Sequence, residues 1–403
     1  MDADRQIGAV VDKLEADGLL EDTFIFYFGD HGGVLPRGKG YAYESGLHVP
    51  LVVRVPENFK HLSPAKMKTR QQGFVSFIDF GPTTLNLAGV AIPSEVDGRP
   101  FLGEGVTAEN VDDRNTAFGY ADRFDEKYDH VRTVRKGRFE YIRNYQPFNF
   151  DGLQNNYRYR MLAFEEWRQK FQSGDLNDVQ SQFFRARPAE QLFDIENDPH
   201  EVNNLANDPA YAEQLKELRS EMTNWVTSMP DLSVYPESVL AAEAFSNPVE
   251  FGQAHKKDIA KILAVADLQL VSFQDAESRL RAAMKSDDPH VRLWAMITCS
   301  HFAKEASALA GAARDLMSND DNRLVRIRAT EFLGLIGEVD PAPVFRRELK
   351  SCEDGIEAGL ILNSLTLLRD GSSKNKFDVR PNWFHPDAVK NETVQRRLEY
   401  LGP

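Results

Sequence analysis

The sequence predicts an α/β fold followed by a region built only of helices, and three observations lead to this prediction. An amphipathic segment over 2–18 runs directly into an apolar strand at 23–28. Short strand patterns follow between 115 and 145, and strand patterns cease after about residue 230. A helix, a short turn and an apolar strand make an α/β unit, whereas short strands joined by tight turns are typical of an antiparallel segment.

The first helix and strand lead to the first candidate site. The helix has one apolar face, and Gly18 is an ordinary residue for its C-terminal cap. Six β-branched or aromatic residues at Thr23–Phe28 predict a strand that is buried on both faces. The strand stops at Gly29–Gly33, which is polar and rich in glycine. Because open α/β sheets bind their ligands at the carboxyl ends of strands, a ligand is expected at this point.

The later elements of the fold are predicted from local pattern. A second apolar strand is expected at 49–55 and a helix at 74–88, where Pro82 requires a kink. The segment 149–188 is polar and aromatic and is expected to wrap the surface. The other predicted elements are strands at 117–121, 131–135, 139–143 and 191–194 and an amphipathic helix at 209–229.

The C-terminal part of the chain contains an internal repeat. Residues 288–295 align with 322–329 at an offset of 34 residues, and a weaker third copy covers 353–368. A polar turn, a Val-Arg pair and an apolar helix are typical of stacked helix pairs, slightly shorter than the HEAT period of ~40 residues. We therefore expect HEAT-like antiparallel helices from about 240 to 370, packed as a separate unit. An irregular helical bundle is the alternative.

The repeat makes specific predictions about packing and partners. A concave face of the repeats with exposed aromatic residues would favour a scaffold that binds a partner protein. The repeat register predicts burial of Val291, Leu293, Val325 and Ile327 and equivalent places for Arg292 and Arg326.

Composition excludes several classes of protein. The 403 residues include 48 Lys and Arg against 62 Asp and Glu, which gives a formal charge of −14. This balance argues against a general nucleic-acid binder, although a local basic pocket for an anionic substrate stays compatible with it. No apolar run approaches the ~20 residues of a membrane-spanning helix. The two cysteines, Cys299 and Cys352, cannot make a disulfide framework.

Three residues near the first strand carry the chemistry that the sequence suggests. Asp30 beside His31 suits a divalent cation, and the flanking glycines let the backbone approach a ligand closely. Lys39 lies between two glycines and can bring a positive charge to an anion. A cation next to a lysine fits a tetrahedral oxyanion such as sulfate or phosphate. Taken alone, Asp-His-Gly is more commonly a turn that an aspartate caps.

In combination, these residues resemble the sulfatase family of the alkaline-phosphatase-like superfamily. The resemblance extends from the start of the chain to about residue 230. It implies part of an alkaline-phosphatase-like α/β sheet over 1–110 and a small antiparallel α+β subdomain over 111–235, before a HEAT-like helical domain and tail over 236–403. The matching residues are the leading helix, Gly29–Gly32, Lys39, Tyr43–Pro50, Asp79–Thr83 and the closing segment Arg187–Ala206.

The resemblance implies a role for each residue of the first site. Asp30 and His31 match two ligands of a calcium ion, and Lys39 matches a catalytic lysine that contacts the sulfate. His48 lies in a matching position and is expected to bind substrate. In this family, Glu44 and His48 more often support the loop than act on the substrate directly.

A second group of predicted substrate residues lies in the antiparallel segment, a region that often lines the substrate cleft in this family. Arg123 and His130 are expected to bind substrate there, within a charged cluster that includes Asp129 and Arg132. A solvated hairpin is the alternative. Further along the chain, four polar residues could form either a metal-binding loop or a turn that caps a helix. They lack the ligand spacing of an EF-hand, which favours the turn; the residues are Asp194, Asn197, Asp198 and Glu201.

The family's nucleophile has no counterpart in the sequence. It is a Cys or Ser in a Cys/Ser-x-Pro-Ser/Ala-Arg motif that is converted to formylglycine, and neither Cys299 nor Cys352 lies in such a motif. We therefore expect the second half of a catalytic domain, with the nucleophile and further metal-binding aspartates upstream and no activity from this chain alone. No leader pattern occurs at the N-terminus, and the resemblance implies a periplasmic or extracellular parent enzyme.

The sequence leaves three functions open. The first is a calcium-dependent hydrolase of sulfate esters or sulfamates, with a sulfated small molecule or carbohydrate as substrate. The second is a phosphodiesterase or phosphonate hydrolase of the same superfamily, which differs mainly in the missing nucleophile. The third is a non-catalytic scaffold whose helical repeats bind a partner.

Overall fold

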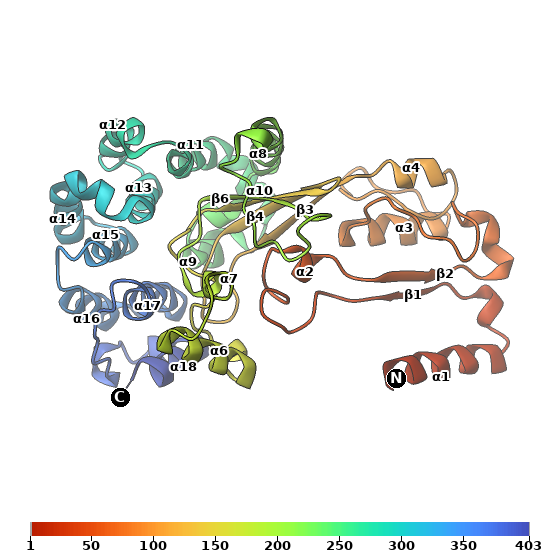
Figure 1. The fold of residues 1–403 in the computed structure, drawn as a ribbon, viewed down its shortest axis with the longest axis horizontal. Helices are drawn as coiled ribbons and strands as arrows, with labels where there is room; N and C mark the ends of the chain where they lie inside the picture. The colour runs from red at the N-terminus through yellow and green to blue at the C-terminus, as the bar shows by residue number, and fades with distance from the viewer. Residues whose placement is uncertain (1, 403) are drawn as a thin grey trace. The chain divides into compact units, whose positions relative to one another are not determined.

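The computed structural model describes residues 2–402, and within them the chain forms two compact units (Figure 1). Unit 1 holds the residues up to Gly119 together with Val134–Glu140 and Asp194–His200. Unit 2 holds Tyr120–Thr133, Tyr141–Phe193 and everything from Glu201 onwards. The structure is a mixed α/β fold with two small antiparallel sheets and many helices, which confirms the predicted class at this level.

Unit 1 is built around a two-stranded ribbon with one packed face. Strand β1 (Ile25–Phe28) pairs antiparallel with β2 (Leu51–Arg54). On one face, Phe26 packs against Phe80 and Phe101, with ring centroids 6.0 and 6.2 Å apart. The helices of the unit are α1 (Asp2–Ala16), α2 (Glu44–Leu47), α3 (Phe80–Leu87) and α4 (Ala108–Asp112), and its buried core residues are Val55, Phe101, Leu102 and Val111.

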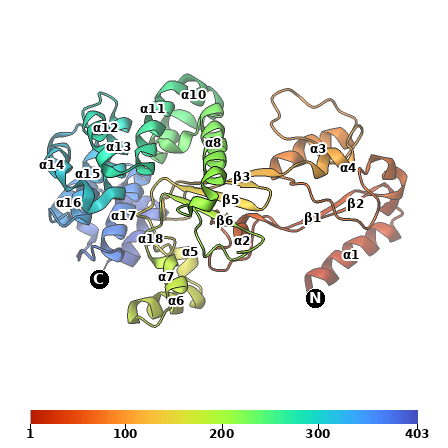
Figure 2. The same cartoon turned by 45° about the horizontal axis from the view of Figure 1, so that its top comes forward.

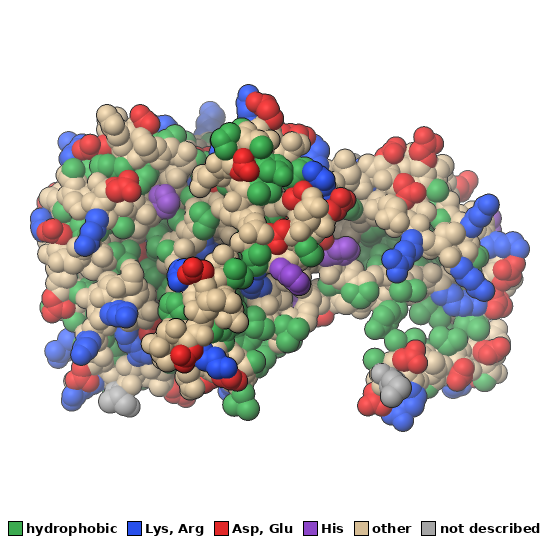
Figure 3. Space-filling view, viewed as in Figure 1, with side chains coloured by type: hydrophobic (Ala, Val, Ile, Leu, Met, Phe, Trp, Pro, Cys, Tyr) green, Lys and Arg blue, Asp and Glu red, His purple; other side chains and the backbone are tan. Residues whose placement is uncertain are grey.

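The expected burial of the first strand on both faces is wrong. Tyr27, on the opposite face from Phe26, is 44% exposed, and the strand's partner runs antiparallel rather than parallel. Phe28 is 41% exposed although its ring packs against Phe77 and Phe80 on the packed face. A ribbon of two strands can cover only one face with the helices and loops that this unit provides, and α1 has no buried residue. Figure 3 accordingly shows hydrophobic side chains at the surface over α1 and the ribbon.

Helix α3 begins later than its pattern predicted. A turn of 3-10 helix at Phe77–Asp79 precedes it, so Pro82 falls in the first turn and no kink is needed. Asp79 is buried and accepts hydrogen bonds from the backbone of Ser76 and Arg99. Thr83 accepts one from the backbone of Phe101. These residues of the family-like motif therefore hold the 99–101 segment against the helix.

The second sheet confirms four predicted strands, each to within a few residues. Its strands are in the order β3-β4-β5-β6, so β3 lies at an edge. The sheet contributes residues to both units. The strands are β3 (Thr116–Ala121), β4 (Val131–Lys136), β5 (Phe139–Asn144) and β6 (Glu190–Asp194).

The segment 149–188 is more buried than its polar composition suggested. It contains α5 (Asn156–Tyr159), α6 (Leu162–Ser173) and α7 (Asp178–Ser181). Aromatic and apolar side chains spaced between the polar ones face the interior, which a surface wrap would not allow. The fully or nearly buried ones include Phe150, Leu153, Phe164, Phe183 and Phe184.

The part of the chain described beyond β6 contains helices and no strand. Helices α13, α15 and α17 lie side by side within unit 2 (Figures 1 and 2). The longer helices are α8 (Ala212–Ser228), α11 (Lys256–Ala266), α12 (Phe273–Ala283), α13 (Pro289–Phe302), α14 (Ala310–Asn319), α15 (Arg323–Leu335), α16 (Ala342–Ser351), α17 (Gly355–Asp370) and α18 (Glu392–Leu401); short ones are α9 (Glu237–Val239) and α10 (Pro248–Ala254).

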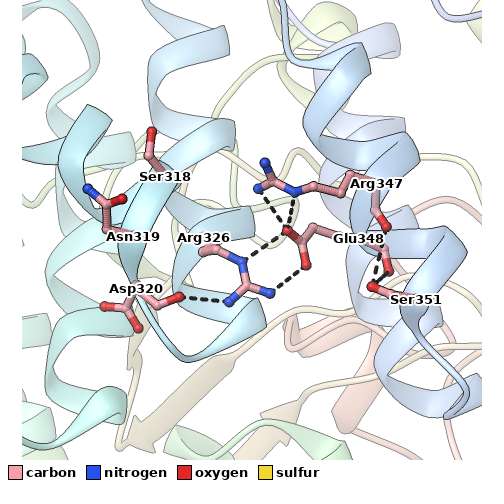
Figure 4. Close-up of a pocket in the computed structure, with 7 residues that line it drawn as sticks. All are labelled: Ser318, Asn319, Asp320, Arg326, Arg347, Glu348 and Ser351. Atoms are coloured by element: carbon pink, nitrogen blue, oxygen red, sulfur yellow. Dashed lines mark hydrogen bonds and ion pairs between the residues drawn. The ribbon is translucent and has the colours of Figure 1, made fainter.

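The repeat register is confirmed in detail. Arg292 donates to the carboxylate of Asp320 and to the main-chain oxygens of residues 286 and 287. Arg326 donates in the same way to Glu348 and to the main-chain oxygens of residues 320 and 321, beside a pocket of about 370 Å³ (Figure 4). All four apolar positions predicted to be buried are less than 9% exposed: Val291, Leu293, Val325 and Ile327. The HEAT-like relationship itself stays a prediction.

These helices do not pack as a separate unit. Arg143 of β5 is 1% exposed and donates to the main-chain oxygen of Ala266 in α11. Arg397 of α18 is fully buried and donates to the main-chain oxygens of Gln154 and Glu126. Buried guanidinium groups must find acceptors, and here they find them across the boundary that composition suggested. Unit 2 therefore joins the helices to the segments 120–133 and 141–193.

No helix within residues 2–402 is both long enough and apolar enough to span a membrane.

Candidate active site

The loop between β1 and β2 carries the predicted site and is closed by its own backbone. The N–H of Gly32 donates to the oxygen of Gly46 (2.9 Å), and the N–H of Lys39 donates to the oxygen of Gly33 (2.9 Å). A Cβ atom at Gly32 would lie 1.9 Å from the carbonyl oxygen of Ser45, so only glycine allows this approach. The loop thus brings the Lys39 backbone next to the residue that follows the Asp-His-Gly motif.

Asp30 and His31 lie together just beyond β1. His31 Nε2 is 3.2 Å from Asp30 Oδ2, and Nδ1 is 2.7 Å from the oxygen of Gly32. A carbonyl oxygen only accepts, so Nδ1 carries the hydrogen and Nε2 of the neutral ring presents a lone pair to the carboxylate. Two electron-pair donors this close need a proton or a cation between them. The Asp30 side chain is 82% exposed and open to such an ion.

The pair has the donor chemistry for a metal ion but not the number of ligands. Calcium prefers about six to eight oxygen ligands. Within residues 2–402, no group of three or more His, Cys, Asp or Glu residues is placed to hold a metal. Asp30 and His31 therefore fit as part of a metal site, and the described residues do not complete it.

The segment before Lys39 is fixed by a residue that sequence analysis missed. Arg37 has a left-handed backbone (φ 64°), and its side chain donates to the oxygen of His200 at 2.5 Å. Its guanidinium also lies 3.9 Å from the centre of the Tyr43 ring. Lys39 itself is partly buried. The family-like spacing pointed to Lys39, but nothing local identified Arg37 as the residue that fixes its loop.

Glu44 and His48 form a pair on the same loop. His48 Nδ1 donates to Glu44 at 2.8 Å, and Arg135 of β4 lies 3.3 Å from the other carboxylate oxygen. The hydrogen bond to Glu44 raises the pKa of His48. Burial would raise the pKa of Glu44, but His48 and Arg135 together lower it. Glu44 therefore orients an exposed imidazole, and Arg135, 91 residues away, carried no sequence signal.

The structure separates the predicted substrate residues of the antiparallel segment. Arg123 is partly exposed and pairs with Glu237 at 3.1 Å. His130 is 1% exposed, stacks on Tyr145 and lies 3.3 Å from Asp231, so its ring is enclosed by protein. The two residues therefore do not form one exposed charged cluster.

Asp129 belongs to a separate buried network. It pairs with Lys127 (3.1 Å) and Arg187 (2.8 Å), and Arg187 also pairs with Asp151 (3.2 Å). All four charged side chains are 6% exposed or less. Because each charge has an opposite partner, the charges within this buried network compensate one another.

The closing segment forms a turn rather than a metal loop. The backbone N–H groups of Asn197 and Asp198 both donate to the oxygen of Asp194, and the Asn197 side chain donates to the Asp194 carboxylate. Asn204 then accepts from the backbone of Leu192. A turn is thus confirmed here, but it does not cap the next helix as the sequence suggested, because that helix begins at Pro209 with Asp208 as its N-cap.

Comparison with known proteins shows which family this loop resembles. Residues 1–90 match the family model described as Sulfatase. Through this segment the chain is similar to the sulfatase family. An ulvan-active sulfatase of Formosa agariphila is 42% identical over 238 residues, which cover 59% of this chain and 38% of that protein.

Two further relatives show the breadth of the similarity. A human N-sulphoglucosamine sulphohydrolase is 28% identical, covering 55% of this chain and 45% of that protein. A multifunctional alkaline phosphatase superfamily protein of Trinickia caryophylli is 30% identical, covering 56% and 38%. The chain therefore spans less than half the length of these curated relatives.

Proposed function

We propose that this chain forms part of a hydrolase that cleaves sulfate esters or sulfamates of carbohydrates. The observation that carries the proposal is the loop between β1 and β2, where Asp30 and His31 face each other and the Lys39 backbone closes onto Gly33. The same loop lies in the segment that matches the sulfatase family model. Relatives named for ulvan and N-sulphoglucosamine support a sulfated sugar as substrate.

In this proposal each residue of the loop has a chemical role. Lys39 donates to the sulfate oxygens and neutralises charge that develops on them. Asp30 and His31 contribute ligands to a calcium ion, which when bound would neutralise further charge on the sulfate. Glu44 holds His48 with its imidazole toward solvent, where it can bind substrate. The nucleophile, a formylglycine in this family, would come from a segment that is not in the printed sequence.

The proposed setting follows from the same relatives. Bacterial carbohydrate sulfatases support a periplasmic or extracellular enzyme, and the acidic charge of −14 argues against a nucleic-acid substrate. The repeat helices would serve as a surface for a protein partner in addition to supporting the catalytic segments.

A phosphodiesterase or phosphonate hydrolase is the second candidate. It is favoured by the similarity to the multifunctional alkaline phosphatase superfamily protein. The metal and lysine chemistry of the loop suits phosphate as well as sulfate. The two candidates differ in substrate, so parallel assays with an aryl sulfate and an aryl phosphodiester separate them.

The decisive experiment compares two proteins: residues 1–403 alone and the same chain extended by the coding sequence upstream of Met1, both produced with a formylglycine-generating enzyme. The extended protein should hydrolyse the aryl sulfate, and the chain alone should not. Lys39→Ala should reduce the turnover of the extended protein at least ~100-fold, as loss of one oxyanion-stabilising donor does. The exposed Lys66 provides the control variant Lys66→Ala, which should leave turnover unchanged.

Two results would contradict the proposal. Turnover by residues 1–403 above the Lys39→Ala background would show that the chain holds its own nucleophile. Equal turnover of the extended protein and its Lys39→Ala variant would remove Lys39 from the reaction. Calcium titration of the extended protein with Asp30→Asn tests the metal role, since that change should raise the calcium concentration required for half-maximal activity.

A further inference from the structure

A solvent-facing tyrosine near the sheet edge has a rigid polar base. Tyr120 lies on β3, the edge strand of the second sheet, and is 68% exposed. It is the most exposed aromatic side chain in the described part of the chain. Such exposure of a large ring leaves one aromatic face available for a ligand.

The base below the ring is Arg132, whose guanidinium carbon lies 5.6 Å from the centre of the Tyr120 ring. Arg132 is 5% exposed and is held at both ends of its guanidinium group. It donates to Asp231 at 2.7 and 2.8 Å and to Asp122 at 2.6 and 3.2 Å. A guanidinium fixed by two carboxylates gives the ring a stationary support, so little side-chain freedom is lost when a ligand stacks on it.

The base continues into the interior of unit 2. Asp231 also contacts His130, which stacks on Tyr145 at a ring distance of 4.3 Å. Trp294 of α13 closes this column and donates to the main-chain oxygen of Val234 at 2.7 Å. The support of the exposed ring is therefore part of the folded core and not a mobile surface group.

Polar groups of both charges follow Tyr120 in the sequence. The Asp122 carboxylate is 27% exposed and accepts a hydrogen bond from Ser233 at 2.7 Å. The Arg123 guanidinium is 44% exposed, and Glu237 pairs with it from one side.

Asp122 lies near the Tyr120 ring, because both contact Arg132. Arg123, in contrast, lies 5.9 Å from the centre of the Tyr128 ring. An aromatic face with a carboxylate nearby matches a sugar, because a pyranose ring offers C–H groups to the face and hydroxyl donors to the carboxylate. Arg123, three residues along the chain from Tyr120, offers a cation for an anionic substituent.

We propose that Tyr120 is a stacking platform for a pyranose ring of a sulfated carbohydrate, with Asp122 accepting from a hydroxyl and Arg123 binding an anionic substituent. The choice of a sulfated carbohydrate as the ligand rests on the proposed function, whereas the stacking platform itself rests on the geometry around Tyr120. The platform binds sugar whether or not a nucleophile is present.

The test is direct binding to the full 403-residue chain by isothermal titration, without turnover. The probes are a sulfated ulvan oligosaccharide, the same oligosaccharide after chemical desulfation, and inorganic sulfate. Tyr120→Ala should weaken binding of the sulfated oligosaccharide about tenfold, and Tyr120→Phe should stay within about twofold of the parent chain, because the face is kept. Arg123→Gln should reduce the preference for the sulfated over the desulfated sugar.

A matched control is available on the same unit. Phe245 is 57% exposed and lies outside the proposed platform, so Phe245→Ala should leave the affinity unchanged. The proposal is overturned if the parent chain binds no sulfated oligosaccharide, if Tyr120→Ala binds as the parent does, or if Phe245→Ala weakens binding equally. Aryl sulfate turnover by the extended protein carrying Tyr120→Ala tests the proposed hydrolase separately from the proposed sugar platform. An aryl sulfate has no sugar ring, so this turnover should not depend on Tyr120.

Discussion

Removal of Arg292 should destabilise the helical region more than removal of its repeat equivalent, Arg326. The two arginines make the same bonds to the backbone: each donates from one nitrogen to the two main-chain oxygens five and six residues before it. They differ in their carboxylate partners, Asp320 and Glu348, which are both 2% exposed. The comparison therefore isolates what happens to a buried carboxylate when its arginine is lost.

Asp320 depends on one cation. Among the residues that the structure describes, only Arg292 has a cationic nitrogen within 4 Å of its carboxylate. Arg292→Met keeps the aliphatic volume but leaves a buried charge without a partner, which costs about 3–5 kcal/mol. The free energy of unfolding should fall by that amount.

Glu348 has other cations beside it. Arg347 lies 2.8 Å and Arg323 lies 3.5 Å from its carboxylate oxygens. Arg326→Met therefore removes hydrogen bonds but leaves the charge compensated. Loss of the bonds to charged groups costs about 1.5–3 kcal/mol. The difference between the two variants should thus be on the order of 1–2 kcal/mol.

Urea unfolding followed by far-ultraviolet circular dichroism measures this difference for the parent and both methionine variants. Adding Asp320→Asn to Arg292→Met should restore part of the stability, because the neutral amide keeps the acceptor for the backbone and removes the buried charge. The reasoning is refuted if Arg326→Met costs as much as Arg292→Met, or if the second change restores nothing.

Three further outcomes follow from the structure. The midpoint of the His48 ring in an NMR titration should lie above the ordinary histidine value and fall in Glu44→Gln; an unchanged midpoint contradicts the pairing. Gly32→Ala should open the loop, since its Cβ would meet a carbonyl oxygen at 1.9 Å, and limited proteolysis should cut there faster than in the unhindered control Gly8→Ala. Burial lowers the pKa of His301 to about 4, so stability should fall by up to about 3 kcal/mol as pH drops from ~6.5 to 4. Urea unfolding at pH 7 and 4.5 measures this loss of stability, which should be smaller in His301→Gln than in the parent chain. An equal loss in both proteins would contradict the assignment to His301.

The local sequence pattern was sufficient to predict those elements whose burial depends on residues close to them in the sequence. The strands at 131–136 and 139–144 follow each other after a turn of two residues, so the local sequence already contains the pairing that forms. The repeat register was also predictable from the sequence, because Arg292 and Arg326 occupy the same position relative to the turn before each helix. These features need no knowledge of distant residues.

Features set by distant residues were not predictable in this way. The apolar run at Ile25–Phe28 does not indicate whether other elements cover one face of the strand or both. In the structure, Tyr27 and Phe28 are partly exposed. Arg135 reaches Glu44 across 91 residues, and Arg397 reaches the backbone of the segment before α5 across more than 240. Long charged side chains make these links, and their partners depend on the folded path of the chain.

Part of the candidate site was predictable from local sequence, and part of it was not. The residue types and order at Asp30, His31 and Lys39 were visible in the sequence, because a turn that carries donors next to a glycine-flanked lysine is a local feature. The arrangement of Asp30 and His31 adds what sequence could not: Nε2, the ring nitrogen that faces the carboxylate, is the one that carries no hydrogen when the imidazole is neutral. That geometry leaves the pair unsatisfied without a proton or cation. It therefore makes the number of further ligands, and not the identity of these two, the question that decides whether calcium binds.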